Sequence, residues 1–152
     1  MRLYSVTNMY MAGIHAGIQT QHSTGELFAK YREYSIQNNT IFEWVIYHKT
    51  TIVLNGGMHQ DLVAVLELLE DWEKHDKEEV IPFAPFYEPG VNNSLTSISI
   101  VMREDAIEFM DLIRKTRPDT PEFEELQEQM LVAYGRKGVP VLQALAFMPL
   151  AK

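Results

Sequence analysis

The chain has 152 residues, with 21 acidic against 13 basic side chains and a formal net charge of −8. It has no cysteine, which excludes disulfides, thiolate metal sites and cysteine nucleophiles. The acidic balance argues against an extensive nucleic-acid surface, because such surfaces neutralise many phosphates, and no apolar run is long enough to span a membrane.

The first half of the chain is expected to alternate strands and helices. A strand is predicted over residues 3–6, then a helix over 13–32 and a short helix over 41–47 that begins at the cap signal Asn39-Thr40. A buried strand over 51–54 ends in Asn55-Gly56-Gly57. The clearest amphipathic helix follows, because apolar residues recur at helical spacing between 62 and 72.

The second half begins with a strand over residues 80–86, which its two prolines place at an edge or in irregular pairing. A long turn over 88–94 leads to a strand over 97–101, in which serine and isoleucine alternate. A helix over 106–113 precedes a last helix that opens at Thr120-Pro121 and ends at Gly135. The apolar tail over 139–150 either packs back on the body or exchanges with a partner.

This order predicts an α/β fold: a three-layer α/β/α arrangement with a mixed, mostly parallel four-stranded sheet, plus an extra C-terminal helix and tail. The short turn between the last two strands makes that pair antiparallel. We expect a single domain over residues 1–152, with the α/β core over 1–116 and the C-terminal helix and tail over 117–152. The N-terminus lacks a signal-peptide apolar segment, so we expect a cytoplasmic protein.

Three polar side chains form a stripe on the first helix. His15, Gln19 and His22 follow one another at spacings of four and three, which places them on one face of the helix. Such a stripe close to the end of a strand is typical of a functional site. Hydrogen-bonded packing of Gln19 and His22 is the alternative explanation.

The N-terminal segment resembles that of the type 2 peptidyl-tRNA hydrolases. In that family a strand ends in an Asp-Leu-x-Met segment, and a helix opens with Gly-Lys and continues Ala-Ala-Gln-x-Ser-His. Met11, Gln19 and His22 match this pattern without a gap, and Asn8 stands where the family has aspartate. Residues 50–62 look like its second strand and helix, and residues 88–96 look like its Asp-Ala-Gly loop and final strand. The resemblance covers residues 1–116.

Several functional positions depart from the family pattern. His15 stands in place of the active-site lysine, Glu88 in place of the loop aspartate, and Asn92 on or near the first loop threonine. The resemblance implies that Glu88 lies near His15, and such a pair is suited to acid–base chemistry near neutral pH. The implied catalytic residues are His15, Glu88 and Thr96. The implied substrate-binding residues are Asn8, Gln19, His22, Asn92 and Asn93, although ordinary turn chemistry also explains the two asparagines.

Two functions are compatible with these residues. The first is a small metal-independent hydrolase that acts on an RNA-derived ester or a small nucleotide. The alternative is a catalytically silent homodimeric protein that sequesters a nucleotide, such as a cyclic dinucleotide, or binds a protein partner. No metal or cofactor is expected, because the five histidines lack the His-Glu-x-x-His spacing. The resemblance suggests a homodimer, and the chain is compatible with a phage or bacterial cytoplasm.

Overall fold

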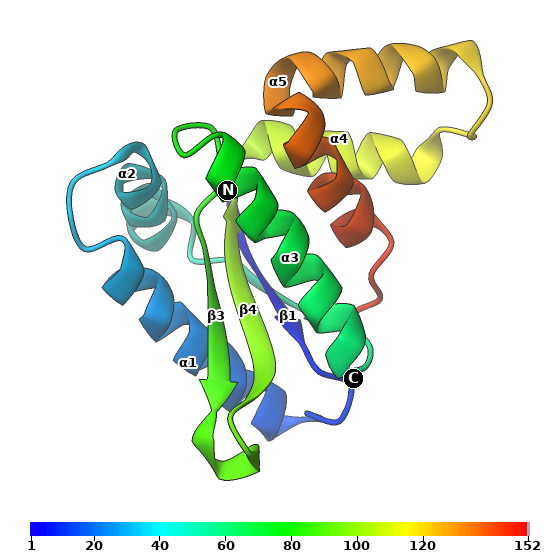
Figure 1. Cartoon of the computed structure of the whole chain (residues 1–152). Coiled ribbons are helices and arrows are strands. Elements are labelled where there is room, and N and C mark those ends of the chain that lie inside the picture. The colour runs from blue at the N-terminus through cyan, green and yellow to red at the C-terminus, as the bar shows by residue number, and fades with distance from the viewer. Residues whose placement is uncertain (152) are drawn as a thin grey trace.

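The computed structural model describes residues 1–151 and consists of a four-stranded sheet with helices on both faces (Figure 1). The strands are β1 (Arg2–Thr7), β2 (Thr51–Asn55), β3 (Phe83–Glu88) and β4 (Ser94–Met102). The α-helices are α1 (Ile14–Lys30), α2 (Ile36–Glu43), α3 (His59–His75), α4 (Glu104–Lys115) and α5 (Pro121–Ala146). A π-helical turn (Trp44–His48) extends α2, and a 3-10 turn (Pro89–Val91) connects β3 to β4.

The sheet has the strand order β2-β1-β4-β3. β1 pairs with β2 in parallel, whereas β4 pairs antiparallel with both β1 and β3. The predicted α/β class, mixed four-stranded sheet and extra C-terminal helix are therefore confirmed. The hydrogen-bonded pairs, however, are not mostly parallel. Helical connections give β1, β2 and β3 one direction, but the β3–β4 hairpin inserts β4 between β3 and β1 and so separates two strands that run the same way.

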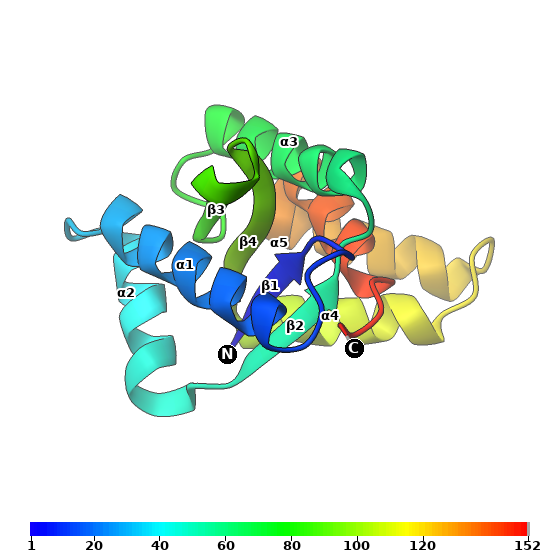
Figure 2. The same ribbon diagram turned by 90° about the horizontal axis from the view of Figure 1, so that it is seen from below.

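The helices form two layers around the sheet. α1 and α2 cover one face, and α3, α4 and α5 cover the other, as the view from below shows (Figure 2). The face toward α3 and α5 carries the larger apolar core, which includes Val6, Ile98, Trp72 and Leu142. The core under α1 and α2 has only six buried apolar residues: Leu3, Leu27, Ile41, Trp44, Ala84 and Val101. Within residues 1–151, no helix combines the length and apolar character needed to cross a membrane.

Some elements begin or end away from the predicted positions. α2 starts at Ile36 rather than at residue 41, because the Ser35 hydroxyl accepts a hydrogen bond from the Asn38 N–H and caps the helix there. β3 spans Phe83–Glu88, and its start is displaced from residue 80. The helix that was predicted to end at Gly135 is interrupted there, but α5 continues beyond it. The backbone is non-helical at that glycine, with φ 64°, and a second helical segment continues to Ala146.

The apolar C-terminal segment packs on the body of the same chain. Val141, Leu142 and Leu145 are fully buried in the larger core. Residues 149–151 then lie beside β2, where the Asn55 N–H donates to the Pro149 carbonyl at 2.8 Å and the Ala151 N–H donates to the Val53 carbonyl at 2.9 Å. Of the two alternatives for the tail, the structure therefore has the one in which it folds back.

Candidate functional site

The candidate site lies where α1 passes the β3–β4 hairpin. The amphipathic pattern of α1 directs Gln19 toward the sheet and leaves His22 half-exposed beside it. Glu88 ends β3 and Thr96 lies near the start of β4, so the hairpin brings both of them under the same stretch of helix. Four residues separated by up to 77 positions in the sequence therefore meet at one end of the sheet.

A hydrogen-bonded chain connects the buried part of the site to its surface. The Thr96 hydroxyl donates to Gln19 Oε1 at 2.6 Å, and Gln19 Nε2 donates to Glu88 Oε2 at 2.9 Å. Thr96 and Gln19 are 1% and 6% exposed, whereas the Glu88 side chain is 24% exposed. The amide of Gln19 is oriented by this arrangement, because the reverse orientation would turn its oxygen toward the Glu88 carboxylate.

The carboxylate of Glu88 is stabilised in its charged form. The hydrogen bond from Gln19 is the largest of the effects that lower the pKa of Glu88 below the usual glutamate range, and the hydrogen bond from the Gly90 N–H, at 3.1 Å, adds to it. The charge of His22 contributes in the same direction. At neutral pH the site therefore presents a fixed negative charge.

His22 is the imidazole that approaches this charge. Its Nδ1 lies 3.9 Å from Glu88 Oε2, too far for a hydrogen bond but within the range of an ion pair when the ring is protonated. The ring also packs against Phe86, with 4.6 Å between ring centroids. The aromatic contact and the carboxylate together restrict the orientation of a ring that is 44% exposed to solvent.

The structure does not bring His15 to Glu88. The His15 side chain is exposed, and its imidazole takes part in none of the hydrogen bonds or ion pairs described within residues 1–151. His15 precedes His22 by seven residues, or about two helical turns, on the same face of α1. The turn of α1 that carries His22 is the one that contacts the β3–β4 hairpin.

The predicted asparagines have local structural roles. Asn8 Oδ1 accepts from the Tyr10 N–H, and the Asn8 N–H donates to the Thr96 carbonyl, which ties the end of β1 to the site. Asn92 and Asn93 are exposed and have φ values of 55° and 57°, in the left-handed region that asparagine tolerates better than most residues. Turn geometry accounts for both, and neither side chain is hydrogen-bonded within the described part of the chain.

A set of hydroxyl groups between α1 and the sheet was missed in the sequence. Thr20 donates to Ser5 at 2.9 Å, Ser23 and Ser99 share a hydrogen bond of 2.7 Å, and the Ser97 hydroxyl donates to the Gln19 carbonyl at 2.7 Å. The signal was present in the serine–isoleucine alternation of β4, which places its serines on the face toward α1. These contacts fix the distance between Gln19 on α1 and the strands of the sheet.

Among residues 1–151, no group of three or more histidine, aspartate or glutamate side chains is arranged to hold a metal ion. No protein-family model matches the sequence, and no curated protein matches it. The chemistry of the site rests on its own groups: the half-exposed imidazole of His22, the carboxylate of Glu88, and the Gln19 amide, which binds the carboxylate and is held by the Thr96 hydroxyl.

Proposed function

We propose that this protein is a small hydrolase in which His22 acts as general acid and base and Glu88 positions and stabilises the imidazole. The observation that supports this most directly is the hydrogen-bonded chain from buried Thr96 through Gln19 to Glu88, whose carboxylate lies 3.9 Å from the half-exposed ring of His22. An RNA-derived ester as substrate follows from the resemblance to type 2 peptidyl-tRNA hydrolases. A small nucleotide is the other substrate considered, because the same acid–base pair can activate water against a phosphodiester.

The proposed reaction needs one proton transfer to His22 and one proton transfer from it. With Nδ1 toward Glu88, the opposite ring nitrogen of neutral His22 accepts a proton from water, and the water oxygen attacks the ester carbonyl or the phosphorus. The proton then passes to the leaving oxygen as its bond breaks. The carboxylate of Glu88 stabilises the imidazolium formed in between, which requires the 3.9 Å separation to shorten when substrate binds.

Replacement of His22 tests the assignment. The protein is incubated with an N-acyl-aminoacyl-tRNA and with cyclic and linear dinucleotides, and products are separated by chromatography. His22→Ala is expected to lower kcat by about 10²–10⁴-fold, the usual contribution of general acid–base catalysis.

Two further variants separate the alternatives. His75→Ala, at the far end of α3, should leave the rate unchanged. His15→Ala distinguishes the two histidines of the α1 stripe: a large loss in this variant, with His22→Ala active, would contradict the catalytic role of His22. If the wild-type protein leaves every compound intact, the hydrolase proposal fails.

A catalytically silent binding protein is the second candidate. It is favoured by the fact that both Glu88 oxygens already accept hydrogen bonds, from Gln19 and from the Gly90 N–H, which also suits a purely structural role for the carboxylate. This function predicts saturable binding of one of the same nucleotides without turnover, measured by calorimetry. The homodimer and the cytoplasmic location belong to the same proposal, and the mass of the protein in solution, from light scattering, tests the dimer.

A further inference from the structure

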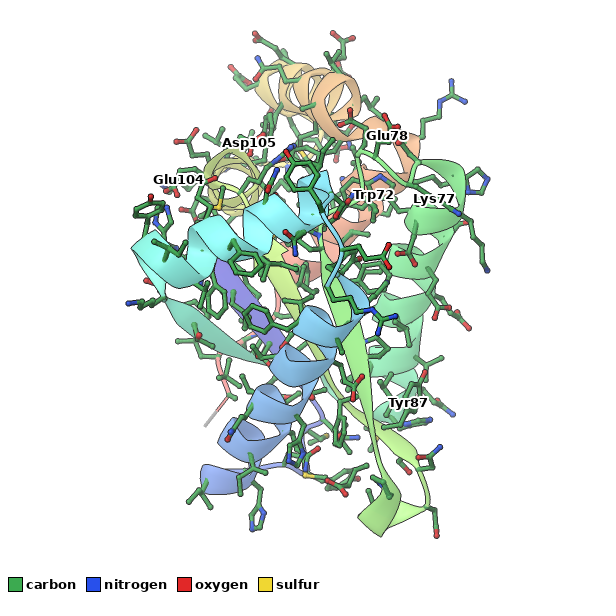
Figure 3. The ribbon with its side chains drawn as sticks, turned by 90° about the vertical axis from the view of Figure 1, so that its left-hand side faces the viewer. Trp72, Lys77, Glu78, Tyr87, Glu104 and Asp105 are labelled. Atoms are coloured by element: carbon green, nitrogen blue, oxygen red, sulfur yellow. The ribbon has the colours of Figure 1, made fainter. Side chains whose placement is uncertain are left out.

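A hollow of about 840 Å³ lies at the opposite end of α1 from Asn8. The end of α1, the loop that leads to α2 and the end of α3 surround it, and Figure 3 faces this side of the molecule, with Lys77 labelled next to the end of α3. Its size is within the range of small-molecule sites. Its charged and aromatic lining residues are Lys30, Arg32, Lys74, Lys77, Glu33, Glu73, Tyr31 and Tyr34.

The hollow is positively charged in an acidic protein. Lys30 is paired with Glu73 at 2.8 Å, so these two charges compensate each other. Arg32, Lys74 and Lys77 take part in none of the ion pairs described within residues 1–151, and Glu33 is the only further acidic residue of the lining. The chain as a whole has a net charge of −8, so this concentration of unpaired cations is a local exception.

The acidic residues on either side of Lys77 do not line this hollow. Asp76 Oδ1 accepts a hydrogen bond from the Glu79 N–H, which holds it in the turn after α3. Glu78 and Glu79 line an adjoining, smaller hollow between α2 and Arg103, which shares Gln37 and Val80 with the first. The basic side chains can therefore be approached by an anion from solvent.

The two tyrosines of the lining have different roles. The Tyr31 hydroxyl accepts from the Phe83 N–H at 3.4 Å, and burial raises the pKa of Tyr31 well above its usual range, so this ring is a neutral part of the wall. The Lys30 ammonium lies 3.8 Å from the centroid of the Phe83 ring, which also holds it in place. Tyr34 is 88% exposed at the rim, and its ring is free to stack on a planar group.

We propose that this hollow binds a nucleoside phosphate, with the phosphate groups at Arg32, Lys74 and Lys77 and the base against Tyr34. The two features that this ligand requires, several unpaired cations and one exposed aromatic ring, occur here within one cavity. The site is separate from the His22 centre: Lys30 follows His22 by eight residues, which corresponds to about 12 Å along α1. It therefore does not depend on the hydrolase proposal.

Binding is measured by calorimetry with three probes: ATP, a short 5′-phosphorylated oligoribonucleotide, and inorganic tripolyphosphate. The double variant Lys74→Gln/Lys77→Gln is compared with Lys49→Gln/Arg136→Gln, which removes the same charge from exposed positions outside the described hollows. We expect the first pair to weaken ATP binding at least tenfold and the second to leave it within about twofold, since only the first removes phosphate contacts. Tyr34→Leu should weaken ATP binding about fivefold or more and leave tripolyphosphate binding unchanged.

The probes also distinguish the source of the nucleotide. ATP binding equal to or tighter than that of the oligoribonucleotide supports a free nucleotide, and the reverse order supports the 5′ end of an RNA. The proposal is overturned if neither probe binds at millimolar concentration, or if the two double variants weaken binding equally. It is also overturned if tripolyphosphate binds as tightly as ATP and Tyr34→Leu has no effect, because the site would then select charge alone.

Discussion

Gln19 is the residue on which the candidate site depends. It is the only side chain there that offers an acceptor to the Thr96 hydroxyl and a donor to the Glu88 carboxylate at the same time. Leucine at this position would remove the nearer of two acceptors of the buried Thr96 hydroxyl and leave only the Phe86 carbonyl at 3.4 Å, and a lost hydrogen bond typically costs about 0.5–1.5 kcal/mol. Glutamate would place a second negative charge beside Glu88. We therefore regard the amide, rather than the size of the side chain, as the requirement at position 19.

The charge of Glu88 should be visible in the pH dependence of stability. Because hydrogen bonds lower its pKa in the folded state, its stabilising effect is present above the usual glutamate range and is lost as the pH falls through the lowered value. Glu88→Gln should therefore be less stable than wild type near pH 6, and the difference should shrink near pH 3. The measurement is the urea midpoint of both proteins at the two pH values.

Glu67→Gln is the matched control, because Glu67 is an exposed residue of α3 with no described hydrogen bond. Its difference from wild type should be small at both pH values. A gap between wild type and Glu88→Gln that stays constant from pH 6 to pH 3 would show that the carboxylate charge does not contribute.

Helical spacing in the sequence was sufficient to propose Gln19 and His22, and the resemblance to type 2 peptidyl-tRNA hydrolases added Glu88 and Thr96. Neither predicted the contacts between them. The helical repeat places His15 and His22 on the same face of α1 and cannot say which turn of the helix meets the hairpin. That depends on where the hydroxyls of Ser97 and Ser99 meet the helix, which is a property of tertiary packing.

At the level of whole elements, the packing of α5 on α3 depends on one small residue. A Cβ added to Gly138 would lie 2.7 Å from Cζ2 of Trp72 and 2.9 Å from Cβ of Tyr134. Trp72 and Tyr134 also contact each other edge to face, with ring centroids 6.0 Å apart. The close approach of the two helices is therefore possible only where α5 has no side chain.

Gly138→Ala should destabilise the protein by about 1–3 kcal/mol, the usual cost of overpacking a core, despite the better helix propensity of alanine. Gly25→Ala in α1 is the matched control, since nothing lies within 4 Å of an added Cβ there. It should raise stability by about 0.4–1 kcal/mol. Chemical denaturation of both variants measures the two effects, and a stabilised Gly138→Ala protein would contradict a close contact between α5 and Trp72.

The helices and strands were largely predictable from the sequence, and the errors in their predicted bounds have local causes. The cap signal Asn39-Thr40 suggested a helix start, but Ser35 supplies the hydroxyl that caps α2. Gly135 does interrupt the helix as predicted, yet the apolar residues beyond it form a second helical segment because they complete the core under α3. The position of β4 inside the sheet was not predictable, because helical connections set strand direction but not the order of strands.

For the whole molecule, both edges of the sheet are protected. At one edge, Pro85 has no N–H to offer, and the Tyr31 hydroxyl occupies the Phe83 N–H. At the other edge, residues 149–151 pair with β2 through two backbone hydrogen bonds, which form an antiparallel bridge between Leu54 and Leu150. Neither edge is therefore open along its full length to a strand from another molecule.

Ending the chain at Met148 should expose the β2 edge. We expect a loss of about 1–3 kcal/mol, since two hydrogen bonds contribute about 0.5–1.5 kcal/mol each. The Asn55 amide should exchange with solvent much faster than in the full chain, because its acceptor is the Pro149 carbonyl. Hydrogen exchange followed by NMR measures both the amide rate and any new self-association. An unchanged Asn55 rate would show that the tail does not protect this edge.

The hydroxyl-rich contact between α1 and the sheet has a consequence for motion. That layer is held by a small apolar core and by directional bonds such as Ser23–Ser99, whereas α3 and α5 are held by extensive apolar burial. Units with little apolar burial open at lower free energy than the rest of a protein. The α1–α2 layer should therefore detach as a cooperative unit while β1, β4 and α3 stay folded. The buried amides of this layer should then exchange with solvent at one common rate, which is faster than the rate for the amides of β1, β4 and α3. Each such opening would carry Gln19 and His22 away from Glu88, so the lifetime of the site is set by the lifetime of this layer rather than by that of the fold.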